Sequence, residues 1–300
     1  MTVPSWHLKL MRAEEHFCHF KLRITRFQQR QVYPVSDGFE SYKDGRLYVW
    51  RLSMPPIEDD MLTLIVGDLL FNVRSALDHL AMALVPPERR DDKTIRTIQF
   101  PIFTRDIDEL DPVTGKYRHE GDRARWIDRT GGINEGAIPT LKWLQPYNFE
   151  TRGLDPEHSS LAILNSLQNA DKHRQLTVLA SGIDDPVYVF TKPDGVVVED
   201  VPDKRPVGTF LGNGTAIDVA VVNDLLGVQM EMAGTPRIYL GEGGGGPYRE
   251  CPDCLAAIID NGWDCVSRLE RFLPPELTHD PTPEPLNLEG WQTFGPESIL

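Results

Sequence analysis

Two short polar segments interrupt apolar stretches of the chain at places where a helix would normally bury its side chains. The first covers residues 72–80, Asn-Val-Arg-Ser-Ala-Leu-Asp-His-Leu, and the second covers residues 169–174, Asn-Ala-Asp-Lys-His-Arg. Together they offer imidazole for proton transfer near neutral pH and cations that stabilise developing negative charge. Because charged groups are costly to bury without partners, we take these segments as the candidate functional site.

Helical periodicity, at about 100° per residue, sorts the polar residues of these two regions into two sets. The first set lies on polar stripes and comprises Asp68, Asn72, Ser75, His79, Asn165, Asn169, Lys172 and His173. The second set lies at or inside the apolar faces and comprises Arg74, Asp78, Asp171 and Arg174. Four charges of balanced sign predict an ion-pair network between the two helices, in which Asp171 and Arg174 are buried and structural.

The spacing of apolar residues predicts four long helices, at residues 5–32, 57–85, 155–180 and 252–272. Asp155 followed by Pro156 indicates the start of the third helix. Period-two runs bounded by Gly, Asn and Pro predict antiparallel strands within 186–240, after a short extended piece at 47–50.

These elements predict an α+β protein, a bundle of four long helices with a small antiparallel β module inserted before the last helix. The expected parts are a helical bundle at 1–180, with an irregular segment at 88–153, and a β insertion at 181–246. The fourth bundle helix follows at 247–273. A tail at 274–300 is rich in Pro and acidic residues.

The chain has a net charge of −14, and this charge is unevenly distributed. Residues 1–53 carry nine basic and five acidic side chains, whereas residues 181–300 carry seven basic and twenty acidic ones. An acidic protein repels nucleic acid at long range, so tight DNA binding is not expected, while local capture of RNA by the basic part is compatible with this distribution. No apolar run is long enough to span a membrane, and a cytoplasmic location is the expectation.

The segment from Arg74 to His79 resembles the Arg-x(4–6)-His pattern of the HEPN domains, helical bundles that often act as metal-independent ribonucleases. Together with the Asp-Lys-His-Arg run at 171–174, it is also similar to a set of uncharacterised bacterial and phage proteins. The resemblance implies that His79 acts as general acid or base and that Arg74 stabilises charge on the phosphate. It also implies a site shared across a homodimer, with no cofactor. We therefore take as catalytic candidates Arg74, His79, Asn72, Asp78 and His173, and as structural or binding candidates Asn169, Asp171, Lys172 and Arg174.

Two other classes of function stay open at this point. Carboxylates and histidines that project inward from facing helices are typical of bundle metalloproteins. The alternative metal ligands are Asp68, His79, Asp171 and His173. In the other class, the protein is a non-catalytic interaction protein whose polar residues only specify helix pairing, and Arg74 and Asp78 form a structural i,i+4 pair.

Overall fold

The computed structural model describes residues 3–28, 35–42, 45–52, 57, 59–173, 176–191, 195, 197–200, 211–212, 216–221, 229–242, 247–274 and 277. The chain divides into two compact units. The helical unit contains Met1–Phe20, Leu64–Leu176 and Asp253–Leu300, and the sheet unit contains Lys21–Thr63 and Thr177–Pro252. Helices and antiparallel sheets thus occupy separate parts of the chain, which confirms the α+β class.

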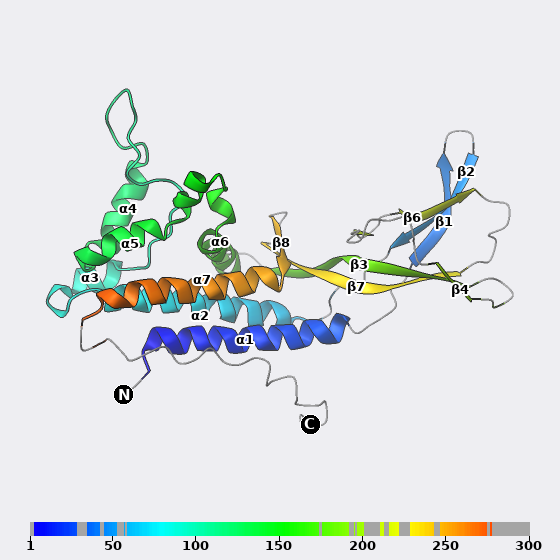
Figure 1. Cartoon of the computed structure of the whole chain (residues 1–300), viewed down its shortest axis with the longest axis horizontal. Helices are drawn as coiled ribbons and strands as arrows, with labels where there is room; N and C mark the ends of the chain where they lie inside the picture. Colours follow the sequence, from blue (N-terminus) through cyan, green and yellow to red (C-terminus); the bar gives the residue numbers. More distant parts are fainter. Residues whose placement is uncertain are drawn as a thin grey trace. The chain divides into compact units, whose positions relative to one another are not determined.

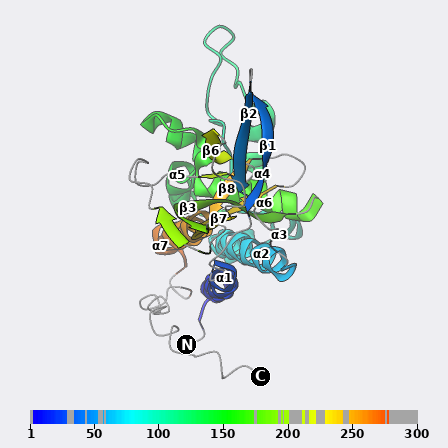
Figure 2. The ribbon, with the colours of Figure 1, turned by 90° about the vertical axis from the view of Figure 1, so that its right-hand side faces the viewer.

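Three long helices lie side by side in the helical unit: α1 (Ser5–Gln28), α2 (Met61–Ala83) and α7 (Asp253–Leu269) (Figures 1 and 2). Two hydrogen bonds show that helices α1 and α7 run in opposite directions. The indole of Trp6 donates to Glu270 at 2.7 Å, and the indole of Trp263 donates to Glu14 at 2.7 Å. Each hydrogen bond joins a carboxylate of one of these two parts of the chain to an indole of the other.

The core of the helical unit lies where these three helices meet. Its fully buried side chains come from each of them and include Leu10, Leu69, Leu77 and Leu255. At Gly262 of α7 the helices approach closely: a Cβ atom there would lie 3.0 Å from Leu10 and 3.3 Å from Val73. Glycine is therefore required at this crossing because a larger residue has no space.

Shorter helical elements complete the helical unit. Its α-helices are α3 (Asp92–Thr97), α4 (Glu120–Thr130), α5 (Ile138–Trp143) and α6 (Ser160–His173), and α6 contacts α7. Its 3-10 turns are η1 (Pro87–Arg89), η2 (Glu135–Ala137), η3 (Pro146–Arg152), η4 (Pro156–His158) and η5 (Glu270–Phe272). None of the described helices is both long and apolar enough to cross a lipid bilayer.

The sheet unit holds two antiparallel sheets. The first has the order β1-β2-β6, from β1 (Val35–Tyr42), β2 (Gly45–Leu52) and β6 (Ala216–Val221). The second has the order β4-β3-β7-β8, from β4 (Val197–Asp200), β3 (Thr177–Thr191), β7 (Gln229–Gly241) and β8 (Tyr248–Cys251), and β5 (Leu211–Gly212) also pairs with β3. The β3–β7 pairing extends from Thr177 opposite Gly241 to Thr191 opposite Gln229, with two register shifts.

The structure corrects several sequence-based boundaries. Residues 177–180, predicted as the end of the third helix, begin β3, because the β-branched pair Thr177 and Val178 joins a ladder with β7. Residues 35–42, for which no strand was predicted, form β1, which pairs with β2 along its whole length. Lys21–Thr63 therefore belongs to the sheet unit, unlike the predicted 1–180 bundle. The capping role of Asp155 is confirmed, since its carboxylate accepts from the Glu157 amide, although it opens η4 and not α6 itself.

Some predictions fall wholly or partly outside the described residues. These are the ends of the first helix at 29–32 and nearly all of the 274–300 tail. Three long helices lie together, with α6 as a shorter fourth, and the complete four-helix bundle stays a prediction.

A substitution at Gly262 tests the helix crossing. Gly262→Leu should lower the free energy of unfolding by about 1–3 kcal/mol, because the added carbons meet Leu10 and Val73. Gly121→Leu is the matched control, since nothing lies within 4 Å of a Cβ atom at this exposed position of α4. Urea unfolding followed by circular dichroism measures both. Equal stability of the two variants would contradict the close approach.

Candidate functional site

A cleft of about 380 Å³ in the helical unit is lined by side chains of α2, α4 and α6 and by the segment before Phe100. Most of its lining groups are polar or charged, in a part of the molecule otherwise built on an apolar core. The lining residues are Phe71, Arg74, Ser75, Asp78, His79, Gln99, Arg129, Asn165, Gln168, Asn169 and Lys172.

The cleft brings the two polar segments of the sequence together. Arg74, Asp78 and His79 come from α2, where spacings of four and five residues place them on neighbouring turns. Asn169 and Lys172 come from the last turns of α6. Five of the nine candidate catalytic, structural or binding residues therefore line one space.

The ion pair between Arg74 and Asp78 holds one wall of the cleft. The Arg74 Nε donates to the Asp78 carboxylate at 3.3 Å, Nη2 lies 3.2 Å from the same carboxylate as an ion pair, and Nη2 donates to the Phe100 carbonyl at 2.9 Å. Asp78 in turn accepts from the Phe100 amide at 2.9 Å. The Arg74 side chain is only 10% exposed, and its Nη1 has no partner among the described residues. The pair thus fixes the segment at Phe100 against α2 and leaves one buried donor unused.

His79 is the solvent-accessible imidazole of the cleft. Its side chain is exposed, and its Nδ1 lies 3.0 Å from the Ser5 hydroxyl of α1. This contact orients the ring, and among the described residues the other nitrogen, Nε2, has no hydrogen-bond partner. An imidazole held at one nitrogen and open at the other is arranged to exchange a proton with a bound molecule.

Positive charge exceeds negative charge along the lining. Three side chains carry positive charge, those of Arg74, Arg129 and Lys172, and Asp78 is the one carboxylate in the lining. Burial lowers the pKa of the Arg129 guanidinium, and the charge of Arg74 lowers it further. Since both guanidinium groups stay protonated, they repel each other, and an anion placed between them would relieve that repulsion.

Other predicted residues lie elsewhere. Asn72 is buried, donates to the Asp68 carbonyl at 2.8 Å within its own helix, and is not among the residues that line the cleft. His173 ends α6, and its side chain is not among the described ones. Arg174 lies outside the described residues.

The predicted burial of Asp171 is also wrong, because its side chain is exposed. Its carboxylate lies against Gly67, where a Cβ atom would be 2.9 Å from Oδ1. Partial burial there, together with the Asp68 carboxylate, raises the pKa of Asp171. Within the described part of the chain no ion pair joins Arg74 or Asp78 to Asp171, and Arg74 pairs instead with Asp78 inside α2. The part of the expected network that involves Arg174 lies outside the described residues.

The register of the helices explains this outcome. Gly67 meets Asp171, while residues 71–79 share the cleft with residues 165–172. Arg74 lies seven residues beyond Gly67 on α2, on the order of 10 Å along the helix axis, and is thus more than a turn away from Asp171. The polar segments overlap in space but are offset along the helix axes.

Of the four alternative metal ligands, the three whose side chains are described do not converge, and the side chain of His173 lies outside the described ones. Across the described residues, no group of three or more His, Cys, Asp or Glu side chains is placed to hold a metal ion. Asp68 lies near Asp171, but His79 is eleven residues beyond Asp68 on α2, on the order of 16 Å along the axis.

Sequence reasoning missed Phe71, Gln99, Gln168 and Arg129 as lining residues. Arg129 belongs to α4, in the region predicted only as short helices and loops, and no periodicity connects it with α2. Phe71 was detectable as a large apolar residue on the exposed side of a helix, where it is 54% exposed.

Removing Asp78 tests the pair that holds the cleft wall. Asp78→Ala should lower the free energy of unfolding by about 2–4 kcal/mol, because it leaves the buried Arg74 guanidinium without its carboxylate and the Phe100 amide without an acceptor. Thermal and urea unfolding measure the change. Asp128→Ala, at an exposed position of α4, is the control. A loss no larger than that of the control would show that the pair contributes little.

No protein-family model, no curated protein and no solved structure matches this chain. The HEPN-like resemblance therefore rests on Arg74 and His79 in the sequence itself. What the protein does is inferred from the residues that line the cleft.

Proposed function

We propose that the protein binds single-stranded RNA in the cleft between α2 and α6 and cleaves it without a metal ion, as a HEPN-like ribonuclease. The observation that carries this proposal is the excess of cationic groups around an exposed imidazole. Arg129 and Lys172 have no carboxylate partner in the lining, in a chain whose net charge is −14. Phosphate is the anion that such a set of donors suits.

The cleavage step in this proposal is a transesterification. His79 Nε2 removes the proton of the ribose 2′-hydroxyl, the 2′-oxygen forms a bond to phosphorus, and the bond from phosphorus to the 5′-oxygen breaks. The leaving 5′-oxygen takes up a proton from water, and His79 returns its proton to the solvent, so the products are a 2′,3′-cyclic phosphate and a 5′-hydroxyl end. Arg129 and Lys172 stabilise the charge that develops on the phosphate oxygens.

The role of Arg74 differs from the one implied by the resemblance. Its guanidinium is largely occupied by Asp78 and the Phe100 carbonyl. We therefore assign Arg74 to holding the cleft wall and to adding positive charge, and we assign the direct phosphate contacts to Arg129 and Lys172.

Base recognition has a place in the same cleft. Phe71 exposes its ring at the lining, with the Lys9 ammonium 5.2 Å from its centre, and it offers a face on which an unpaired base stacks. The neighbouring amides of Asn165 and Asn169 present donors and acceptors to a base edge. These groups favour single-stranded over duplex RNA, because duplex bases are already stacked and paired.

The four-helix arrangement and a site completed by a second copy of the chain belong to this proposal as parts of the HEPN-like resemblance. Binding of a nucleotide without cleavage is the second candidate function, and the same cationic lining supports it. The measurements below distinguish the two functions, because cleavage produces new RNA ends, whereas binding alone only fills the cleft.

The cleavage test uses the purified full-length chain, fluorescently labelled single-stranded RNA and excess EDTA. His79→Ala should lower the cleavage rate by about 10²–10⁴-fold, the usual contribution of a positioned acid or base. The fold should be unaffected because the ring is exposed. His158→Ala, which removes another exposed histidine, should cleave as the wild type does. Absence of cleavage in the wild type, or equal cleavage by His79→Ala, would remove the ribonuclease proposal.

The binding test uses RNA with 2′-O-methyl groups, which cannot undergo this cleavage. Lys172→Gln should weaken binding and lower the slope of log affinity against log salt concentration by about 0.7, as expected for one phosphate contact on a single strand. Lys116→Gln, at an exposed loop position, should leave both quantities unchanged. An unchanged salt slope in Lys172→Gln would show that Lys172 does not contact a phosphate of the RNA.

A further inference from the structure

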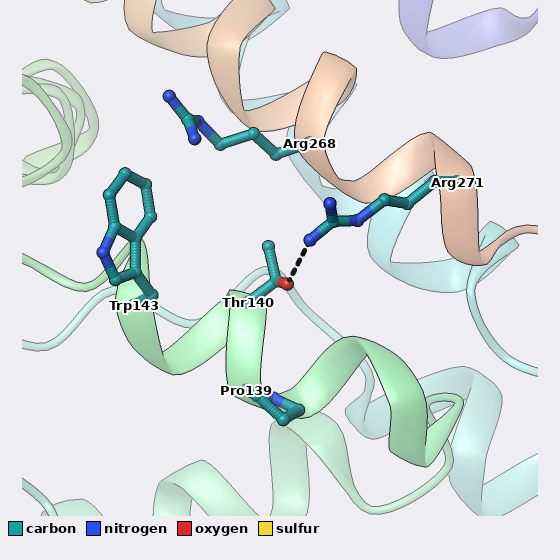
Figure 3. Close-up of a pocket in the computed structure, with 5 residues that line it drawn as sticks. All are labelled: Pro139, Thr140, Trp143, Arg268 and Arg271. Atoms are coloured by element: carbon teal, nitrogen blue, oxygen red, sulfur yellow. Dashed lines mark hydrogen bonds between the residues drawn. The ribbon is translucent and has the colours of Figure 1, made fainter.

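A second pocket, of about 240 Å³, lies between α5 and the end of α7 (Figure 3). Five residues line it: Pro139, Thr140, Trp143, Arg268 and Arg271. None of them lines the cleft described above. Two guanidinium groups and a hydroxyl thus share a small space whose lining contains no carboxylate.

The Arg268 guanidinium is held in a defined orientation at this pocket. Its Nε donates to both Asp264 oxygens, at 2.8 and 2.7 Å, and its Cζ lies over the Trp143 ring, 4.5 Å from the ring centre. Figure 3 shows this guanidinium close to the indole. Among the described residues the two Nη atoms make no hydrogen bond, so their N–H groups are available to an acceptor.

Arg271 supplies the second cation, three residues further along the chain. Its Nη2 donates to the Thr140 hydroxyl at 3.2 Å, the dashed line in Figure 3. No carboxylate pairs with this guanidinium among the described residues, and most of its five N–H donors are unused. Because the Thr140 oxygen accepts this hydrogen bond, its own proton is free to be donated.

We propose that this pocket binds a phosphate group, held by Arg268, Arg271 and the hydroxyl of Thr140. Asp264 balances one of the two positive charges, so a net positive charge stays at the pocket. A phosphate presents several strong acceptor oxygens in a tetrahedral arrangement, which suits donors arriving from two guanidinium groups and a hydroxyl. The phosphate comes either as the free ion or as part of a nucleotide.

The test follows Trp143, whose indole N–H reports on this pocket. The full-length chain is labelled with ¹⁵N-tryptophan, the Trp143 signal is assigned from Trp143→Phe, and inorganic phosphate is added at constant ionic strength. We expect a saturable shift of that signal. Arg271→Gln should weaken binding at least tenfold, and Thr140→Val should weaken it several-fold. Arg96→Gln, at an exposed position of α3, should bind as the wild type does.

Further arms decide the source of the phosphate and the specificity of the pocket. Adenosine monophosphate that binds more tightly than inorganic phosphate, and that also depends on Arg271, would identify a nucleotide as the source. Equal affinity would identify the free ion. The proposal is overturned by a signal that does not saturate, by an unchanged affinity in a folded Arg271→Gln, or by acetate binding as tightly as phosphate.

Discussion

A guanidinium group that leaves water must find acceptors, and the helical unit is arranged to supply them to Arg74. The carboxylate of Asp78 and the carbonyl of Phe100 meet this requirement, and the amide of Phe100 returns a hydrogen bond to the same carboxylate. An irregular segment with no regular ladder of its own is thereby attached to α2. Because the buried Arg74 guanidinium needs these acceptors, the hydrogen bonds that it makes fix the position of the cleft wall.

The same segment is held a second time a few residues further on. The buried amide of Gln145 accepts from the Phe103 N–H at 3.0 Å and donates to the Pro101 carbonyl at 3.0 Å. Just before these two attachments, the Gln99 N–H donates to the Arg129 carbonyl at 3.4 Å, which brings α4 to the cleft. The side chains of Arg74 and Asp78 on α2 and of Gln145, which precedes η3, here take the place of a neighbouring strand.

The helical periodicity of the sequence predicted those parts of the site that depend on residues close together in the chain. Periodicity placed His79 on an exposed stripe and Arg74 with Asp78 at the apolar border, and the structure agrees with each. It did not find Arg129, because the contact between α4 and α2 depends on a long irregular connection. The sequence pattern did not predict the pairing of β2 with β6 for the same reason, since this pairing joins residues more than 160 positions apart. Helix and strand were also confused at Thr177–Ala180, where apolar residues fit either period until a partner strand decides.

The hydrogen bonds from Trp6 and His7 to Glu270 join residues that are more than 260 positions apart. Helical proteins usually fold fast because their contacts are local, but here the first helix completes its packing only with the last. During synthesis, α1 therefore has to wait for nearly the whole chain before its apolar face is covered. Until α7 emerges, part of the apolar face of α1 is open in the nascent chain, and exposed apolar surface of this kind favours aggregation.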